Sequence, residues 1–323
     1  MSSHVPQGTL LHFATRDQPP FHRVPFWLEV FARQVVHLDV ELQSDTPLEA
    51  EASLLALPGI RLLWCKSATP AIWKRTSDWL KDGDDDLAIV MSIGGKAIRS
   101  QLGRELEISP GDGIGILNNE TASIRTHQLN FVGVMVPRSG LSPLVPDIDR
   151  ATLQVVRRET GALRLLQAYL AILRRDWGEA DGTLNKLAAG HIRDLVALSI
   201  GTSRDGEEIA KRSARAARLC AMKSAIAENP GIHLAELAER QGVTPRYVQM
   251  LFEEEGMTFT IYVLEQRLNR AHATLVDPRY DHWTIAAIAF HAGFGDISHF
   301  NRNFKHRYGG TPSEVRDEAQ RTR

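Results

Sequence analysis

The sequence contains two copies of one helical pattern near its C-terminal end. Residues 234–255 read LAELAERQGVTPRYVQMLFEEE, and residues 285–308 read IAAIAFHAGFGDISHFNRNFKHRY. Each copy has an alanine-rich amphipathic segment, a glycine, an N-capping residue type and a second amphipathic segment. This order predicts a helix-turn-helix unit, and two units in one chain constrain the fold far more than one.

The residues between the two segments of each copy fit a sharp turn. Gly242 and Gly293 stand where the backbone must reverse, which glycine does at the least steric cost. Thr244 and Asp296 are residue types that cap the start of a helix. The second helices are therefore predicted at 245–255 and 297–307.

Each second helix has one apolar side, set by Val248 and Leu251 in the first copy and by Phe300 and Phe304 in the second. The opposite sides carry side chains that contact base edges or phosphates in protein–DNA complexes. These candidate DNA-binding residues are Arg246, Gln249, Met250, Ser298, His299, Arg302, Lys305 and His306.

The charge of the chain is unevenly distributed. Residues 211–323 hold 16 Lys and Arg against 13 Asp and Glu, a balance of +3. The remainder holds 22 basic and 26 acidic residues, a balance of −4, which gives the net charge of −1. A basic C-terminal part is consistent with a polyanionic partner, although so small an excess also fits a solvated surface.

The same composition argues against export and membrane insertion. No apolar run approaches the roughly 18 residues that span a bilayer, and the start MSSHVPQGTLLHFATRDQPP lacks a basic segment followed by an apolar one. Cys65 and Cys220 form no CxxC pair. We expect a reduced, cytoplasmic protein without a membrane partner.

The N-terminal part has a different pattern. From about 9 to 136 the sequence is rich in short apolar segments such as LAIVMSIGG (87–95), separated by turn residues such as Pro110-Gly111-Asp112-Gly113. WLEVFARQV (27–35) is a candidate helix ahead of this sheet. Short strands with frequent turns predict a β-sandwich or barrel, so the whole chain is of the α+β class.

A helical hairpin is predicted after the strands. Helices at 163–175 and 184–200 are joined by WGEADG, and either pack on their own sheet or form a dimer surface. Their apolar stripes consist of Leu163, Leu166, Leu170 and Leu173, and of Leu187, Ile192, Leu195 and Leu198. The polar segment that begins at Gly201 indicates a linker.

The C-terminal pattern resembles the DNA-binding domain of AraC/XylS-type transcription regulators. The resemblance rests on GVTPRYVQMLFEEEGMTFTIYVLEQRLNRA (242–271) and TIAAIAFHAGFGDISHFNRNFKHRYGGTPSEVR (284–316). It implies two helix-turn-helix units tied by a central helix at about 259–275, which carries the matching pair Arg267-Leu268. Met250 departs from the family, which often has Arg or Lys there, so one base or phosphate contact is replaced by apolar contact with a thymine methyl or lost.

The N-terminal part is similar, less specifically, to the cupin-like β-barrel sensor of these regulators. ISPGDGIGILNN (108–119) and VGVMVPRSGL (132–141) carry this resemblance. It implies a cupin-like effector-sensing and dimerisation domain at 1–200, a linker at 201–215 and a DNA-binding domain at 216–323. The implied partners are a double-stranded DNA operator, a small-molecule effector, RNA polymerase and a second copy of the chain.

Residues for effector binding are harder to select. Trp64, Trp73, Arg75, Met91 and Arg99 are candidates, because pockets combine apolar walls with a few polar anchors. The same residue types also serve as plain core or as structural charges. An effector-independent or protein-partner-controlled activator, with the barrel filled by its own side chains, is the alternative.

Metal and catalytic sites are not predicted. His291, His299 and His306 match no zinc-ligand spacing, and His127 is the only histidine between residues 38 and 190, so the HxH pair of a metal cupin is missing. Cys65 lies in the apolar run LLWCK, which indicates burial rather than reactivity. We expect no enzyme and no cofactor, and a cupin enzyme fused to a DNA-binding domain is the remote alternative.

Overall fold

The computed structural model describes residues 8–44, 47–151, 154–177, 182–201 and 204–321. The chain divides into two compact units, Met1–Ala217 and Arg218–Arg323. Of the predicted connections, residues 178–181 in WGEADG and 202–203 in the linker lie outside the described residues.

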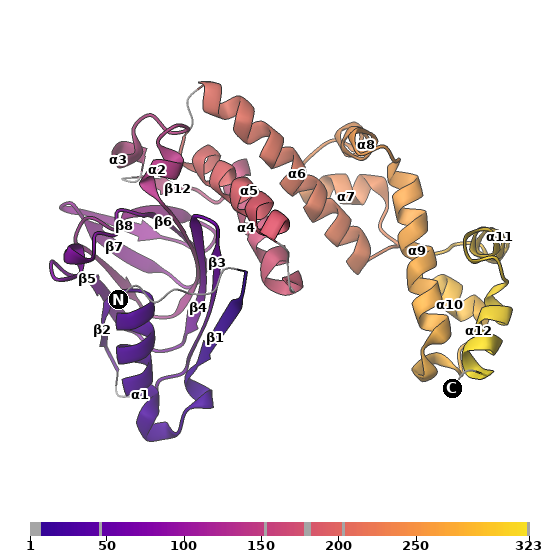
Figure 1. The fold of residues 1–323 in the computed structure, drawn as a ribbon, viewed down its shortest axis with the longest axis horizontal. Coiled ribbons are helices and arrows are strands. Elements are labelled where there is room, and N and C mark those ends of the chain that lie inside the picture. The colour runs from indigo at the N-terminus through magenta and orange to yellow at the C-terminus, as the bar shows by residue number, and fades with distance from the viewer. Residues whose placement is uncertain (1–7, 45–46, 152–153, 178–181, 202–203, 322–323) are drawn as a thin grey trace. The chain divides into compact units, whose positions relative to one another are not determined.

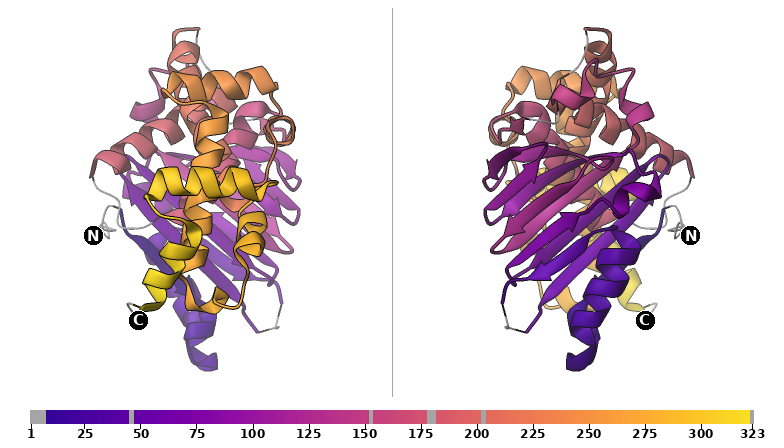
Figure 2. Two further views of the ribbon diagram at one scale, coloured as in Figure 1. Left: turned by 90° about the vertical axis from the view of Figure 1, so that its right-hand side faces the viewer. Right: turned by 90° about the vertical axis from the view of Figure 1, so that its left-hand side faces the viewer.

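The first unit contains two antiparallel β-sheets, and their strands can be followed in Figure 2. The seven-stranded sheet has the order β1 (Leu10–Ala14), β3 (Ala50–Leu57), β4 (Ile60–Ser67), β11 (Leu129–Val136), β6 (Leu87–Gly94), β9 (Gly113–Leu117) and β12 (Val155–Val156). The five-stranded sheet has the order β2 (Asp39–Leu42), β5 (Ala71–Arg75), β10 (Ala122–Thr126), β7 (Ala97–Gln101) and β8 (Arg104–Ile108). Within the described residues no strand belongs to both sheets, so the predicted barrel is open rather than closed.

One hydrophobic core of this unit lies where the helix Phe26–Val35 packs against the strands. Trp27 and Phe31 are buried and stack with ring centroids 4.2 Å apart. Leu63 and Cys65 of β4 and Trp73 of β5 belong to the same buried cluster. The predicted helix at 27–35 is confirmed, and Cys65 is buried as its apolar run indicated.

A helical hairpin, α4 (Gly161–Asp176) and α5 (Gly182–Ile200), follows the strands and lies beside the seven-stranded sheet (Figure 1). Leu163, Leu166 and Leu170 are buried, as their spacing predicts. Of the second predicted stripe, Ile192 and Leu195 are buried, whereas Leu187 is 54% exposed and does not pack on the sheet. The short helices α1 (Arg23–Pro25), α2 (Arg138–Leu141) and α3 (Ile148–Ala151) complete this part.

The Pro-Gly-Asp turn holds the hairpin segment to the sheet. Asp112 is 3% exposed, and its carboxylate accepts hydrogen bonds from Arg157 Nη1 and from the Arg158 backbone N–H, both at 3.0 Å. The carbonyl of Gly111 accepts a hydrogen bond from Gln167 of α4 at 3.0 Å. The turn therefore joins the strands to the helices that follow them.

The remaining elements are helical. They are α6 (Arg204–Glu228), α7 (Leu234–Gln241), α8 (Pro245–Glu254), α9 (Phe259–Val276), α10 (Ile285–His291), α11 (Ile297–Tyr308) and α12 (Pro312–Arg321). Where a linker was expected, helix α6 begins at Arg204, because the segment is rich in Ala, Arg, Lys and Glu, which favour helices.

Candidate DNA-binding surface and effector cavity

The first helix-turn-helix unit consists of α7 and α8. Gly242 ends α7 with φ +62°, in the left-handed region that glycine tolerates best. Thr244 caps α8, because its side-chain oxygen accepts a hydrogen bond from the Tyr247 backbone N–H at 3.2 Å. Val248 and Phe252 are completely buried under α8, so the opposite face of this helix is free to meet a partner.

The second unit, α10 and α11, repeats this construction. Gly293 has φ +94°, and Asp296 caps α11 by accepting a hydrogen bond from the His299 backbone N–H. Phe300 and Phe304 are fully buried and lie with ring centroids 5.3 Å apart. Both predicted turns and caps are therefore present.

The central helix α9 holds the two units in one body, with α7 and α8 along one part of it and α10, α11 and α12 along the other (Figure 1). Phe259 and Val263 pack in the core of the first unit, and Leu268 and Leu275 pack in the core of the second. Because one continuous helix contributes to both cores, the spacing of α8 and α11 is fixed by packing.

The DNA-binding candidates lie mainly on the outer faces of α8 and α11. Seven of the eight are exposed: Arg246, Gln249, Ser298, His299, Arg302, Lys305 and His306. The exception is Met250, which is half-buried and packs against the core of the first unit. Its side chain therefore serves packing at least as much as outward contact.

One residue of this surface was missed by sequence reasoning. Asn301 is exposed and lies three residues after Ser298, on the same side of α11 as Arg302 and Lys305. Asparagine can form two hydrogen bonds to adenine in the major groove. Helical spacing from Ser298 was the signal that could have found it.

A cavity of about 230 Å³ lies between the two sheets of the first unit. Its lining is mostly apolar and includes Phe31, Leu63, Trp73, Val90, Ile108 and Ile124. A dry cavity of about 150 Å³ is known to admit benzene, so this one has room for a small organic molecule.

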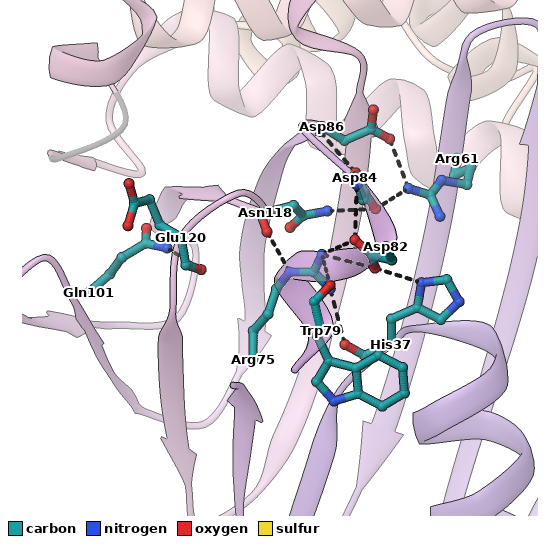
Figure 3. Close-up of polar contacts among 10 residues, drawn as sticks. All are labelled: His37, Arg61, Arg75, Trp79, Asp82, Asp84, Asp86, Gln101, Asn118 and Glu120. Atoms are coloured by element: carbon teal, nitrogen blue, oxygen red, sulfur yellow. Dashed lines mark hydrogen bonds and ion pairs between the residues drawn. The ribbon is translucent and has the colours of Figure 1, made fainter. Parts of the chain in front are cut away.

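Part of the cavity wall is a network of paired charges (Figure 3). The guanidinium of Arg75 donates hydrogen bonds to Asp82 at 2.8 Å and 3.0 Å and to the carbonyls of His37, Trp79 and Asn118. The His37 ring also lies 3.2 Å from the Asp82 carboxylate. These hydrogen bonds occupy the donors of the guanidinium. Arg75 therefore has a structural role, because it links β5 to the segments that contain His37, Trp79–Asp82 and Asn118.

Arg61 forms a second set of ion pairs beside it. Its Nη2 donates to Asp84 at 2.9 Å and to Asp86 at 2.8 Å. Burial raises the pKa of Asp86, while the hydrogen bond from Arg61 acts to lower it. Both arginines of this network thus have carboxylate partners.

The five candidates for effector binding differ in whether they line the cavity. Trp73 and Arg75 line the cavity. Trp64 and Met91 are buried away from it, toward the helical hairpin: Arg174 of α4 lies 6.0 Å from the Trp64 ring centroid. Arg99 is not among the residues that line the cavity; it is fully buried and pairs with the cavity-lining Ile124 across the five-stranded sheet.

Other chemistry has little support in the described part of the chain. No group of three or more His, Cys, Asp or Glu side chains in that part is arranged to hold a metal ion. Burial raises the pKa of the Cys65 thiol, which disfavours the reactive thiolate. No helix among the described residues is long and apolar enough to cross a membrane.

These features define a class of protein: a β-rich unit with an internal cavity, followed by two helix-turn-helix units on one helical body. Residues 27–200 match the AraC-binding-like domain, and residues 237–318 match a helix-turn-helix domain. The chain belongs to the AraC family of transcription regulators.

Known proteins share parts of this arrangement. The transcriptional activator RhrA of Rhizobium meliloti (strain 1021) is 31% identical over 167 residues, which are 51% of this chain and 52% of RhrA, so the match spans about half of that relative. The transcriptional activator NphR of Rhodococcus sp is 25% identical over 74% of this chain and 72% of NphR. The crystal structure of the AraC-like transcriptional activator CuxR has a TM-score of 0.52 at 16% identity, covering 82% of this chain and 96% of CuxR, which is a likeness of fold.

Proposed function

We propose that this protein is a sequence-specific DNA-binding transcription activator of the cytoplasm. The carrying observation is that two capped recognition helices, α8 and α11, are fixed on one central helix and expose polar and basic side chains. Recognition helices on one rigid body suit successive major grooves on one face of an operator, about one helical turn (~34 Å) apart. The activator names of RhrA and NphR support the direction of control.

The contacts divide by chemistry. Arg302 suits guanine, Gln249 and Asn301 suit adenine, and Ser298 suits several base edges. Arg246, Lys305, His299 and His306 suit phosphate oxygens. The second unit exposes more basic side chains than the first, where Glu253, Glu254 and Glu255 follow the recognition face. We therefore infer that α11 contributes more of the affinity for DNA.

A small molecule bound in the cavity is the proposed effector. It would act by a population shift, favouring one arrangement of the sensor and hairpin and so one spacing of the DNA-binding units in a dimer. The alternative of effector-independent control requires a barrel filled by its own side chains, and the cavity of about 230 Å³ argues against it. RNA polymerase is the proposed protein partner at the promoter.

A second copy of the chain is the proposed partner of the helical hairpin. Leu184 and Leu187 near the start of α5 are 50% and 54% exposed, while Ile192 and Leu195 further along the helix are buried. Exposed leucines one turn apart on a helix suit packing against an equivalent helix. The dimer would place two pairs of recognition helices on one operator.

Selection of bound DNA from a random pool, with and without cell extract, tests this proposal. We expect an enriched sequence with two conserved blocks about one helical turn apart, and stronger enrichment when extract supplies the effector. Recovery of unenriched DNA in both arms would contradict sequence-specific binding. An enriched operator that does not respond to extract would contradict effector control alone.

A further inference from the structure

The first recognition helix, α8, is contacted near both of its ends by basic side chains of α6. Near the start of α8, the guanidinium of Arg218 lies over the ring of Tyr247, with its Cζ atom 5.5 Å from the ring centroid. Just beyond the end of α8, Lys223 donates a hydrogen bond to the Glu255 carboxylate. A cation over an aromatic ring and an ion pair are both attractive, so α6 holds the two ends of α8.

Helix α6 is itself anchored on the central helix. The Nζ atom of Lys223 lies 5.7 Å from the ring centroid of Tyr262 in α9, and Tyr262 packs against Phe252 of α8 with ring centroids 5.3 Å apart. At the end of α6, the Glu228 carbonyl accepts a hydrogen bond from Arg270 of α9 at 3.3 Å. Lys223 therefore connects α8 to a helix that is already fixed in place.

The apolar side of α6 packs in the same unit. The core of the first helix-turn-helix unit includes three buried residues of α6, which are Leu219, Met222 and Ile226. Val248 and Phe252 of α8 belong to the same cluster. The place of α8 on this core consequently depends on α6 as well as on α9.

The second recognition helix, α11, is held in a different way. At its end, the Tyr308 hydroxyl donates a hydrogen bond to the Asn269 side chain of α9 at 3.0 Å. The Tyr308 ring also stacks on His272 of α9, with ring centroids 4.5 Å apart. Among the described residues, none of α6 belongs to the hydrophobic core of this unit. Side chains of α9 thus fix α11, whereas side chains of α6 fix the ends of α8.

The orientation of α8 matters for base reading. Arg246 and Gln249 lie on its exposed outer face. Hydrogen bonds to base edges weaken steeply when their distance or angle departs from the optimum. A small shift of α8 on its core can therefore remove base contacts while the fold stays intact, because recognition needs closer tolerances than folding.

We propose that Arg218 and Lys223 are positioning residues for DNA recognition, which set the orientation of α8 and so the sequence preference in the block of the operator that α8 reads. This inference rests on the proposed function, in which α8 and α11 each read one block. Neither side chain needs to touch DNA for this role. Their loss leaves α8 folded but less well oriented, and it leaves base reading by α11 unchanged.

Selection of bound DNA from a pool of random duplexes by the purified full-length protein, with and without cell extract, is the test. Gln249→Ala and Arg302→Ala identify the block that each helix reads, because each variant alters one recognition helix. We expect Arg218→Ala and Lys223→Ala to lower the base preference in the α8 block by about tenfold, the value of one good base contact. The preference in the α11 block should be unchanged.

Glu255→Ala separates positioning from the general attraction of positive charge to DNA. Lys223→Ala removes a positive charge and Glu255→Ala removes a negative one, so their electrostatic effects on binding to a non-operator duplex have opposite signs. Both variants break the same ion pair, however, and positioning predicts that both lower the preference in the α8 block. Changes of that preference in opposite directions would overturn the proposal.

Conservative variants separate positioning from folding. Arg218→Lys and Lys223→Arg keep a cation over the ring and beside the carboxylate, and both should retain most of the preference in the α8 block. Arg279→Ala removes an exposed charge that pairs with Asp277, and as the control it should leave both blocks unchanged. An equal loss of preference in both blocks for Arg218→Ala and Lys223→Ala, or a loss in neither, would refute the positioning role.

The outcomes also distinguish this inference from the proposed function. Recovery of unenriched DNA by the wild type would contradict sequence-specific binding, and this inference with it. Two enriched blocks in the wild type that respond identically to the loss of Arg218 or Lys223 would contradict this inference alone.

Discussion

Arg267 of the central helix donates a hydrogen bond from Nε to the carbonyl oxygen of Pro230, at 2.7 Å. Pro230 lies in the segment before α7, so this contact ties the first helix-turn-helix unit to α9. The same guanidinium is close to the turn of the second unit, because a Cβ added to Gly293 would lie 3.2 Å from Arg267 Nε. Arg267 therefore touches parts of both units.

Replacing Arg267 with alanine should weaken the coupling of the two units. Loss of the donor leaves the buried Pro230 carbonyl unsatisfied, which typically costs about 1–3 kcal/mol of stability. Urea unfolding of Arg267→Ala measures this loss, and a gel shift on the selected operator measures the accompanying loss of affinity. Arg279→Ala is the control, since Arg279 is exposed and pairs with Asp277 two residues away. Equal behaviour of the two variants would contradict a coupling role for Arg267.

Arg302 and Phe300 should separate binding from folding on the same helix. Arg302→Ala should weaken operator binding by about 1–3 kcal/mol if the side chain contacts a base, with little change in stability. Phe300→Ala should destabilise the domain by about 3–5 kcal/mol, because a fully buried ring is removed. Gel-shift titration and thermal unfolding of both variants give the two quantities. Undiminished affinity of Arg302→Ala at moderate salt would refute the contact.

Local rules predicted the helix-turn-helix units well. Capping by Thr244 and Asp296 and turning at Gly242 and Gly293 depend on neighbouring residues, so the sequence carries the signal directly. Repetition then removed the ambiguity that a single motif would leave. The position of Met250 was harder to predict, because a residue at the edge of an apolar stripe can point either into the core or toward solvent.

The cavity was less predictable for a physical reason. Strand β4 is buried on both faces, one toward the other sheet and one toward the hairpin, so its apolar residues do not alternate with polar ones. Without alternation, nothing local shows that Trp64 faces the hairpin while Trp73 of β5 faces the cavity. The hydrogen bonds of Arg75 to the carbonyls of His37 and Asn118 join residues distant in the sequence, which only the tertiary structure brings together.

Leu187 provides a test of self-association. A charge placed on the exposed side of α5 would have to be desolvated in a dimer but not in the monomer. We expect Leu187→Glu to weaken dimerisation by about tenfold or more, measured by analytical ultracentrifugation without DNA. Leu102→Glu is the matched control, because Leu102 is 50% exposed in the β7–β8 turn, away from the hairpin. A wild-type monomer at micromolar concentration, or an unaffected Leu187→Glu dimer, would refute the proposed interface.

The ion pair of Asp82 with Arg75 should make stability depend on pH in a defined direction. Burial acts to raise the pKa of Asp82, but hydrogen bonds from the Asp84 backbone N–H and from Arg75 outweigh it, so the native pKa is lowered. Asp82→Asn leaves the Arg75 guanidinium, whose side chain is 3% exposed, without its carboxylate, and should cost about 3 kcal/mol at pH 7.

A carboxylate with a lowered native pKa stabilises the fold fully above its unfolded pKa of about 3.9, and this contribution disappears as the pH falls through the native value. The difference between wild type and Asp82→Asn in urea unfolding should therefore be fully present at about pH 5 and above and shrink below about 4. Asp78→Asn, which alters an exposed pair with Lys81, should show almost no difference at any pH. A difference that widens in acid would show that Asp82 does not act through its ionised carboxylate.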